Sequence, residues 1–368
     1  MIKSYNFFVL IVMLAKSIEL FAQSNINHNS EIKTYLDNMT KEDFSGSILV
    51  AKNDSIIERR AYGLASIEFN VENNIDTKFN IASITKMFTS VATLQLYEKG
   101  KVQLNQPIGK YLPNYPNKVV RDSVTIHQLL THTAGTNNFL IGEFLDSGKL
   151  KYKSVKDFLP LFVDEPLLFS PGSDYNYSAA GFVILGLIIE KMNGDNYYEF
   201  VKDNIFIPAS MNHTTELEID SIVKNKAVGY TSLFGENEIL KRNDYYLSKA
   251  DPAGFHYSTV DDLFNFSKAL RNYQLLRKET TELMFATKVK GFNTHLGYGI
   301  DVDQRYNQTI LGHSGGWFGV RCELMDFMDS NYTIIVLSNI DDDGKTGASK
   351  VIDSLKELIA GVKKEVGL

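Results

Sequence analysis

Strand-like sequence is confined to the two ends of this 368-residue chain. Residues 45–63 (SGSILVAKNDSIIERRAYG) hold two aliphatic-rich runs around a polar turn, which predicts a hairpin. Strand patterns return only in residues 296–303, 309–315, 320–328 and 332–339. The sequence therefore predicts an α+β fold, in which both chain ends build one antiparallel sheet flanked by helices. The segment between the two strand-forming ends is predicted to be a large, mostly helical insertion.

Helical patterning fills the rest of the sequence. Apolar spacing predicts a helix from Ser83 to Gly100 and a strongly apolar one over 179–192, which Asn193-Gly194 ends. Further helices are expected to begin at Ser30 and to cover 126–132, 196–205, 257–273 and about 349–364. Ser258 or Thr259 would cap the helix within 257–273. We expect one domain over 23–368, with its sheet region at about 30–100 and 252–368 and its helical region at about 101–251.

The first 22 residues differ from the rest. Lys3 precedes the apolar run Phe7–Leu14, and Leu20-Phe21-Ala22 resembles a cleavage site, so residues 1–22 are predicted to be a secretory signal peptide cut after Ala22. The apolar run is too short to span a bilayer. The mature protein is expected to be periplasmic or secreted, with no stable membrane anchor, because no cysteine follows the run to carry a lipid. The alternative is an N-terminal segment packed on the domain.

Composition narrows the classes of function. The net charge is −6 and no basic block occurs, so nothing favours nucleic-acid binding. The 23 Phe and 19 Tyr argue against disorder. The histidines show no paired ligand spacing, so we predict no metal and no cofactor. Cys322 is the only cysteine, which excludes an internal disulfide, and its strand-like context predicts a small packed hydrophobe.

The start of the helix at Ser83 pairs a serine with a lysine. Ser83 alone would fit an N-cap, but a capping box would place Glu or Gln where Lys86 stands. A lysine there also opposes the helix dipole, at a cost of about 0.3–1 kcal/mol. A catalytic pair explains both residues, because positions three apart are neighbours on a helix and burial favours the neutral amine that accepts the serine proton. The same Ser-x-x-Lys pattern occurs at Ser30–Lys33 and Ser221–Lys224.

Several longer stretches occur in an order typical of one superfamily. They are FNIASITKMFTSVATLQLYEKGKVQLNQPIGKYLP, VTIHQLLTHTAG, PGSDYNYSAAGFVILGLIIEK, AGFHYSTVDDLFNFSKAL, and GHSGGWFG leading to YTIIVLSN. On these residues the chain resembles the serine β-lactamase and penicillin-binding-protein superfamily in its class C-like branch. That branch includes class C β-lactamases, D,D-carboxypeptidases, D-amino-acid peptidases and esterases. The resemblance covers about residues 44–339 and implies a β-lactamase/transpeptidase-like fold with one catalytic domain.

The resemblance also implies roles for individual residues. Ser83 would be the nucleophile and Lys86 its partner. Tyr177, in Tyr177-Ser178-Ala179, would share the base role, and which of Lys86 and Tyr177 removes the proton stays open. His313, in His313-Ser314-Gly315, would orient Tyr177 or a polar group of the substrate. The backbone N–H groups of Ser83 and Gly316 would form the oxyanion hole.

The second motif of the superfamily is Tyr-x-Asn, and the third is Lys-Thr-Gly or His-x-Gly. Literal matches to Tyr-x-Asn and Lys-Thr-Gly elsewhere in the chain are rejected from their context. Tyr115-Pro116-Asn117 lies in a proline-rich loop, and Lys345-Thr346-Gly347 follows a turn with only one helix after it, whereas the third motif of the superfamily needs further strands. Of the other Ser-x-x-Lys pairs, Ser30 lies just past the signal peptide and Ser221 lies in a polar stretch. His132 in THTAG is interpreted as a turn-shaping residue.

The substrate-binding residues are less sharply indicated. Ser314 and Gly315 follow from the third motif, and Trp317, Phe139 and Phe255 are candidates for the pocket wall, although each aromatic residue would equally fit a core position. The oligomeric state is not indicated.

Two departures from the superfamily pattern bear on the substrate. Ala179 replaces an Asn whose amide binds substrate amides, and His313 replaces a Lys that supplies a cation for a substrate carboxylate. Both changes disfavour β-lactam hydrolysis. The leading hypothesis is an exported serine hydrolase that forms an acyl-enzyme at Ser83 and cleaves an ester or a D-amino-acid-type peptide or amide bond in a small-molecule or peptide substrate. The alternatives are a D,D-carboxypeptidase or β-lactamase acting on cell-wall peptides or β-lactams, and a catalytically silent binding or scaffold protein on the same fold.

Overall fold

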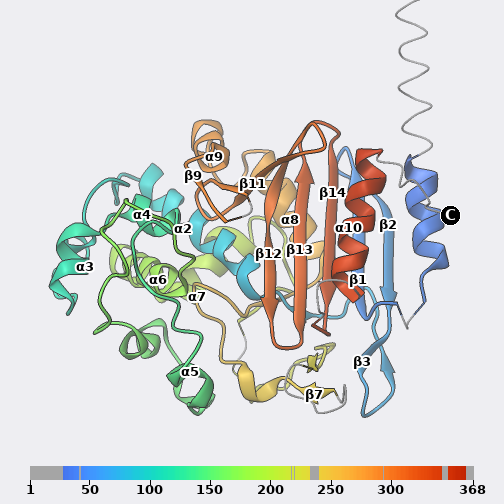
Figure 1. Cartoon of the computed structure of the whole chain (residues 1–368), viewed down its shortest axis with the longest axis horizontal. Coiled ribbons are helices and arrows are strands. Elements are labelled where there is room, and N and C mark those ends of the chain that lie inside the picture. Colours follow the sequence, from blue (N-terminus) through green and yellow to red (C-terminus); the bar gives the residue numbers. More distant parts are fainter. Residues whose placement is uncertain are drawn as a thin grey trace, which may run out of the picture.

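The two ends of the chain meet in one sheet. The computed structural model describes residues 28–40, 43–216, 218, 220–232, 240–292, 294–341 and 347–361. The expected signal peptide, Lys345 and Thr346 lie outside these residues. An antiparallel eight-stranded sheet has the order β2-β1-β14-β13-β12-β11-β10-β9 (Figure 1). The strands are β1 (Gly46–Lys52), β2 (Ser55–Tyr62), β9 (Val289–Lys290), β10 (His295–Leu296), β11 (Asp301–Arg305), β12 (Gln308–Trp317), β13 (Val320–Phe327) and β14 (Tyr332–Ser338).

The pairing of β1 with β14 joins the chain ends. Gly46 lies opposite Ser338 and Lys52 opposite Tyr332. The predicted α+β architecture, with one antiparallel sheet built from both ends, is therefore confirmed. The hairpin predicted within 45–63 is β1 and β2, and its turn places Asn53 and Asp54 in the left-handed region at φ 48° and 58°.

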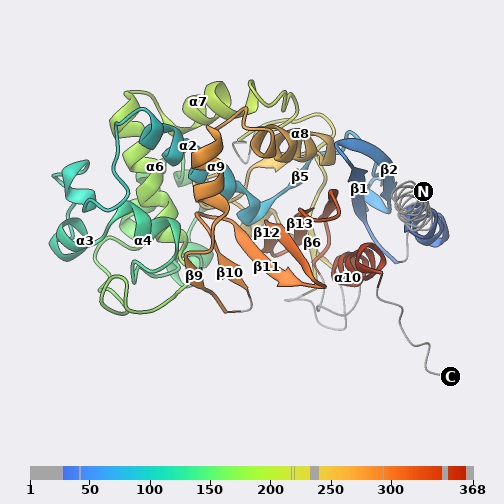
Figure 2. The same ribbon diagram turned by 90° about the horizontal axis from the view of Figure 1, so that it is seen from above.

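Helices cover both faces of the sheet. The helix over 28–38 and α10 (Gly347–Ala360) lie on one face, and α8 (Val260–Arg271) lies on the other (Figure 2). The central strand β14 is buried along its whole length, which explains its continuous apolar run. Ile334 and Val336 face the α10 side, whereas Ile335 and Leu337 face the main core.

The main core continues into the helical region. There α6 (Ala179–Asn193) lies against α2 (Thr85–Glu98), α4 (Ile126–Leu130) and α7 (Tyr197–Val201). Ser178 caps α6 by accepting the Gly181 N–H at 3.0 Å, and Gly194 ends it at φ 89°. The helix predicted over 196–205 is α-helical only to Val201 and continues as the π-helical turn η5 (Lys202–Phe206).

Short elements complete the fold. They are α3 (Lys118–Ser123), α5 (Glu143–Asp146), α9 (Lys278–Phe285), the paired strands β3 (Leu64–Ser66) with β4 (Val71–Glu72), β5 (Phe79–Asn80) with β8 (Tyr257–Ser258), and β6 (Tyr230–Thr231) with β7 (Lys241–Arg242). The 3-10 turns are η1 (Ala82–Ile84), η2 (Ile108–Lys110), η3 (Lys149–Lys151), η4 (Val155–Leu161) and η7 (Asp244–Tyr246). The sequence did not predict α9 or the β6–β7 pair. None of the described helices is both long and apolar enough to cross a membrane.

Candidate active site

Ser83 sits on a tight turn rather than at the start of the long helix. The sequence predicted a helix from Ser83, but α2 begins at Thr85, and Ser83 belongs to the 3-10 turn η1 that follows β5. Ala82 has φ 42°, an unfavourable conformation for a residue with a side chain. Asn80 holds it there, because its Oδ1 accepts the Ala82 N–H at 2.9 Å and its Nδ2 donates to the Phe255 carbonyl at 3.2 Å.

Lys86 is fully buried beside the serine. Its Nζ lies 3.1 Å from Ser83 Oγ and donates to the Ala253 carbonyl at 2.6 Å. Burial lowers the pKa of Lys86 far below that of a free lysine, while the charge of Asp251 opposes this shift. The predicted pair is therefore brought into contact, in surroundings that favour the neutral amine.

Asp251 was missed by the sequence analysis. Its side chain is buried, Oδ1 accepts the Ala253 N–H at 2.6 Å, and Oδ2 has no hydrogen-bond partner among the described residues. Burial raises the pKa of Asp251, and the charge of Lys86 acts in the opposite direction. In the sequence, Asp251 followed by Pro252 is typical of an ordinary turn. Only the fold shows that Asp251 shares a buried environment with Lys86.

Tyr177, just before the cap of α6, lies beside Ser83 and Lys86. The Lys86 Nζ is 4.8 Å from the centre of its ring. A side-chain hydrogen bond with Ser83 lowers the pKa of Tyr177, but burial outweighs it and raises the pKa well above that of free tyrosine. The phenol is therefore protonated at neutral pH in this arrangement.

His132 supports Tyr177 directly. The two rings stack with their centres 4.4 Å apart, and His132 Nδ1 accepts the Ser178 N–H at 3.0 Å. Burial lowers the pKa of His132 well below its ordinary value, which keeps the ring neutral. His132 has φ 57°, so it does shape a turn, and it also packs against the tyrosine that precedes α6.

His313 on β12 completes the cluster. Its ring centre lies 6.4 Å from that of Tyr177. Nδ1 is 2.6 Å from the Ser314 carbonyl, which can only accept a hydrogen bond, so we assign the ring proton to Nδ1. Burial and the charge of Lys86 lower the pKa of His313 to about 4, and the third motif therefore carries no cation at neutral pH.

The turn that carries Ser83 packs tightly on β12. A Cβ at Gly315 would lie 2.4 Å from the Ile81 carbonyl oxygen, so only glycine fits there without a shift. Pairing of β11 with β12 ends at Gly312, and among the described residues no strand lies beside His313–Trp317 on that edge. Such an unpaired edge can hydrogen-bond an extended substrate.

A narrow pocket opens between Ser83 and this strand. Gly316, Trp317 and Phe255 line it together with Ser83, and Trp317 Nε1 donates to the Tyr246 carbonyl at 2.8 Å. The backbone groups of Ser83 and Gly316 thus belong to one pocket, as the oxyanion-hole prediction requires.

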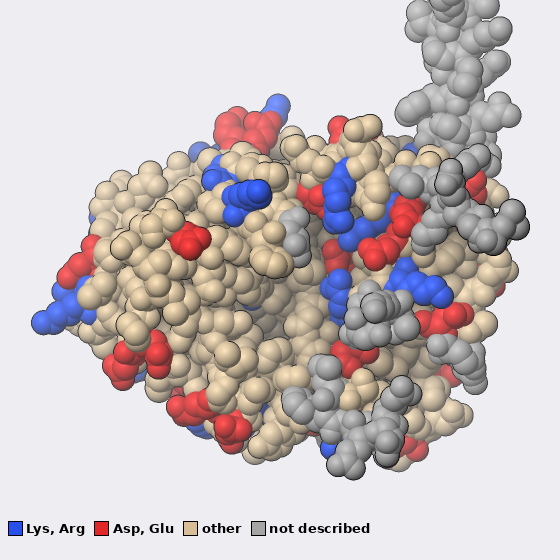
Figure 3. Space-filling view, in the orientation of Figure 1, with Lys and Arg blue, Asp and Glu red and all other residues tan. Residues whose placement is uncertain are grey.

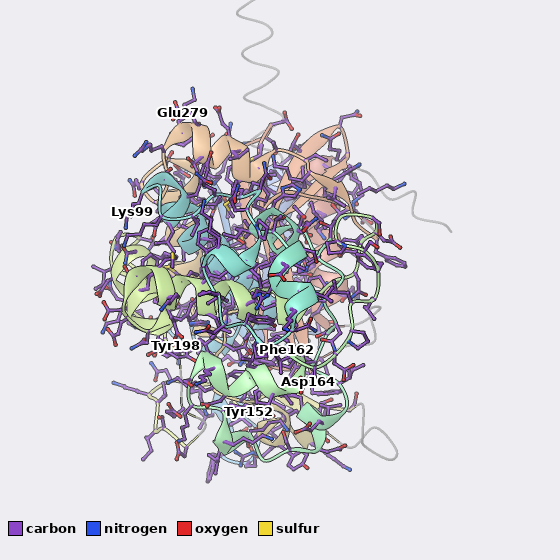
Figure 4. All side chains as sticks on the ribbon, turned by 90° about the vertical axis from the view of Figure 1, so that its left-hand side faces the viewer. Lys99, Tyr152, Phe162, Asp164, Tyr198 and Glu279 are labelled. Atoms are coloured by element: carbon purple, nitrogen blue, oxygen red, sulfur yellow. The ribbon has the colours of Figure 1, made fainter. Side chains whose placement is uncertain are left out.

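Phe139 occupies a different place from the other aromatic candidates. It is buried, and its ring packs against Phe144, Phe158 and Phe162 in an aromatic cluster of the helical region. Figure 4 shows this region from its outer side, with Tyr152 and Phe162 labelled. The structure places Phe139 in the core rather than among the residues that line the pocket at Ser83.

The rejected motifs lie elsewhere. Tyr115 and Pro116 line a separate hollow with Glu190, and Ser30 is part of the helix over 28–38. Ser221 is in an irregular segment. Cys322 is buried, and its Sγ lies 3.3 Å from the Asn80 carbonyl. Within the described part of the chain, no group of three or more His, Cys, Asp or Glu residues is placed to hold a metal ion.

Comparison with known proteins identifies the family of the chain. The sequence model named Beta-lactamase matches residues 37–354. The chain belongs to the β-lactamase family. Penicillin-binding protein 4* of Bacillus subtilis strain 168 is 28% identical to this family member, over 86% of this chain and 73% of the relative.

Solved structures extend the comparison. The penicillin-binding protein of Bacillus halodurans is 29% identical, with a TM-score of 0.79 over 89% of this chain and 99% of its own. A D-stereospecific amidohydrolase from a Streptomyces species is 25% identical, with a TM-score of 0.71 over 86% of this chain and 94% of its own. These likenesses support the β-lactamase/transpeptidase-like fold and a serine hydrolase.

Proposed function

We propose that this β-lactamase family member is an exported serine hydrolase that forms an acyl-enzyme at Ser83 and cleaves an ester or a D-amino-acid-type peptide or amide bond. The observation that carries the proposal is the 3.1 Å contact between Ser83 Oγ and the Nζ of a fully buried lysine. A binding or scaffold protein has no need of this contact. The D-stereospecific amidohydrolase among the similar structures supports the same class of substrate.

The chemistry follows from the positions of the protons. Ser83 Oγ attacks the substrate carbonyl carbon and transfers its proton to a base, while the N–H groups of Ser83 and Gly316 hold the developing oxyanion. Collapse of the tetrahedral intermediate releases the leaving group, which takes a proton from that base. Water then attacks the acyl-enzyme and restores the serine.

We assign the base role to Lys86 rather than to Tyr177. Burial lowers the pKa of Lys86, so the free amine is accessible near neutral pH, whereas burial raises the pKa of Tyr177 and disfavours the phenolate. With Nζ already donating to the Ala253 carbonyl, the lone pair of the neutral amine can accept the Ser83 proton. Tyr177 then serves as a protonated donor beside Ser83.

Covalent labelling tests the nucleophile. A fluorophosphonate probe should label the wild-type protein and fail to label Ser83→Ala. Ser221→Ala is the matched control, because Ser221 begins a Ser-x-x-Lys pattern outside the buried site and should leave labelling unchanged. If wild-type folded protein, verified by its circular dichroism, is not labelled, the nucleophile assignment is wrong and the silent scaffold becomes the better reading.

The same experiment with fluorescent penicillin addresses the second candidate function. The penicillin-binding relatives favour a D,D-carboxypeptidase or β-lactamase. Ala179 and the neutral His313 oppose it, since neither supplies the amide or the cation that these substrates use. Labelling by the fluorophosphonate alone would support the esterase or amidase, and stable labelling by both probes would support the cell-wall carboxypeptidase.

A further inference from the structure

A charged cavity adjoins His313 on the face of the sheet that α10 partly covers. It has a volume of about 160 Å³, comparable to a space that holds one small organic group. Its lining includes Asp301, Asp303, Arg305, His313, Glu323 and Lys356. Gly312, Leu324 and Met325 also line it, and β12 and β13 pack so closely there that a Cβ at Gly312 would lie 1.9 Å from the Leu324 carbonyl oxygen. Figure 3 shows acidic and basic side chains interleaved on this face.

Most charges in the cavity are already paired. Arg305 Nε donates to Asp303 Oδ2 at 2.6 Å on β11. Lys356 Nζ, on α10, lies 3.5 Å from Glu323 Oε1 on β13. Asp301 differs, because no hydrogen bond or ion pair joins its carboxylate to another described residue. It lines the cavity and is only partly exposed. The site therefore holds one carboxylate more than its own cations pair with.

The position of Asp301 links the cavity to the catalytic groups. Asp301 lies opposite Gly312, where β11 ends its pairing and the unpaired edge of β12 begins. Its charge raises the pKa of both Tyr175 and Tyr177, so the two sites interact electrostatically. Gly316 lies four positions after Gly312 on β12, so the cavity lies about 13 Å along the strand from the oxyanion hole.

We propose that this cavity is a substrate subsite for an ammonium group, with the carboxylate of Asp301 as its partner. The inference rests on the proposed hydrolase function and specifies its substrate. β11 occupies the edge of β12 at Gly312, so an extended peptide could pair only with His313–Trp317. A lysine-like side chain would then carry the amine the rest of the way to Asp301. A carboxylate at the same position would be repelled. The titratable and charged groups that line the cavity beside Asp301 are Asp303 and Arg305 on β11, His313 on β12, Glu323 on β13 and Lys356 on α10.

Matched ester substrates test the subsite. Three fluorogenic esters share one leaving group and one spacer of about 13 Å, and end in a primary ammonium, an acetamide or a carboxylate. For the wild-type protein we expect kcat/KM to be about ten- to hundredfold higher for the ammonium ester than for the acetamide ester, as for a hydrogen bond to a charged group. The carboxylate ester should be hydrolysed most slowly.

Two variants separate the subsite from general charge effects. In Asp301→Asn the three esters should react within about threefold of one another, whatever the change in their common rate, because the neutral amide no longer distinguishes the charge of the substrate. Asp353→Asn removes the same charge from an exposed residue of α10 that does not line the cavity, and should retain the wild-type preference. Equal rates for the three esters with the wild-type protein, or an unchanged preference in Asp301→Asn, would overturn the subsite.

The failure of the subsite can be told apart from the failure of the proposed function. Hydrolysis of the acetamide ester without any charge preference removes only the ammonium site. Absence of both hydrolysis and Ser83 labelling removes the hydrolase and the subsite with it. If Asp301→Asn does not fold, the preference of the wild-type protein for the ammonium ester is measured at low and at high salt. An ionic contact weakens with salt, so the preference should be larger at low salt. No preference at low salt contradicts the proposal.

Discussion

Replacing Gly315 by alanine tests how Ser83 is held in position. The added Cβ would lie 2.4 Å from the Ile81 carbonyl oxygen and 3.3 Å from the Ala82 side chain. Cβ atoms essentially never approach an oxygen closer than 3.0 Å, so β12 and the turn must separate by at least roughly 0.6 Å. The overlapping atom belongs to the backbone of Ile81, and the turn carries Ser83 two residues further on. The displacement therefore reaches the nucleophile directly.

The size of the effect follows from this displacement. A misplacement of about 1 Å in catalytic geometry costs about a hundredfold in rate, so we expect kcat/KM of Gly315→Ala to fall by roughly ten- to hundredfold for a small ester. The crowding should also lower the free energy of unfolding by about 1–3 kcal/mol. Ester hydrolysis, the rate of fluorophosphonate labelling and thermal unfolding measure these changes.

Gly148→Ala is the control, because it makes the same substitution at an exposed glycine that does not line the pocket at Ser83. A Cβ there would meet no atom within 4 Å, and the backbone φ of −65° suits an alanine. We expect kcat/KM and stability to change by no more than about 0.5 kcal/mol, or a little over twofold. Wild-type activity and stability in Gly315→Ala, or equal losses in the two variants, would refute the reasoning that close packing on β12 positions Ser83.

Four further predictions follow from the cluster. Lys86→Met should lower kcat/KM by about 10²–10⁴, the range for loss of a general base, in a protein that circular dichroism shows to be folded. In the wild type, kcat/KM should rise with pH as Lys86 loses its proton, and the pKa of this rise should lie below the ordinary 10.5. In Asp251→Asn the rise should move to lower pH, because the variant lacks the carboxylate that favours the ammonium form of Lys86. His132→Phe keeps an aromatic ring beside Tyr177 but leaves the buried Ser178 N–H without its acceptor, and should lower the free energy of unfolding by about 1–3 kcal/mol in denaturant titrations. Burial and neighbouring carboxylates raise the pKa of Asp301 to about 7, so the ammonium preference in ester kinetics should be weak well below pH 7 and full well above it.

The overall fold could be predicted from sequence because its strongest signals are local. The run YTIIVLS in β14 is buried on both faces, and the aliphatic runs of β1 and β2 flank a turn of Asn53 and Asp54 that tolerates positive φ. The start of α2 could not be predicted in the same way. Ser83 and Thr85 both suit a helix terminus, and the 3-10 turn at Ser83 depends on the Asn80 side chain and the packing of β12.

Some residues of the candidate site could be predicted from the sequence, and others could not. Ser83 and Lys86 were predicted because a spacing of three residues can bring a serine and a lysine together, and Tyr177 because the stretch around it resembles the superfamily. Asp251 carries no such signal, since its role depends on burial beside a residue 165 positions away in the chain. Phe139 shows the converse limit, because an aromatic side chain in a loop fits a pocket wall and an aromatic core equally well until its neighbours are known.

Strain and charge at the site point to the same kind of substrate. Three residues with side chains, Ala82, His132 and Phe255, adopt positive φ around Ser83, at φ 42°, 57° and 74°. Such conformations persist only where surrounding contacts hold them, as the Asn80 bonds to Ala82 and Phe255 do, so the pocket is built before substrate arrives. That preformed pocket has a neutral His313, and the neighbouring cavity has its cations paired and the carboxylate of Asp301 unpaired. These residues offer no free cation to a substrate carboxylate, and the charge of Asp301 would repel it. A neutral or ammonium-bearing acyl compound would not be repelled. This difference favours an esterase or amidase over an enzyme that binds carboxylate-bearing β-lactams.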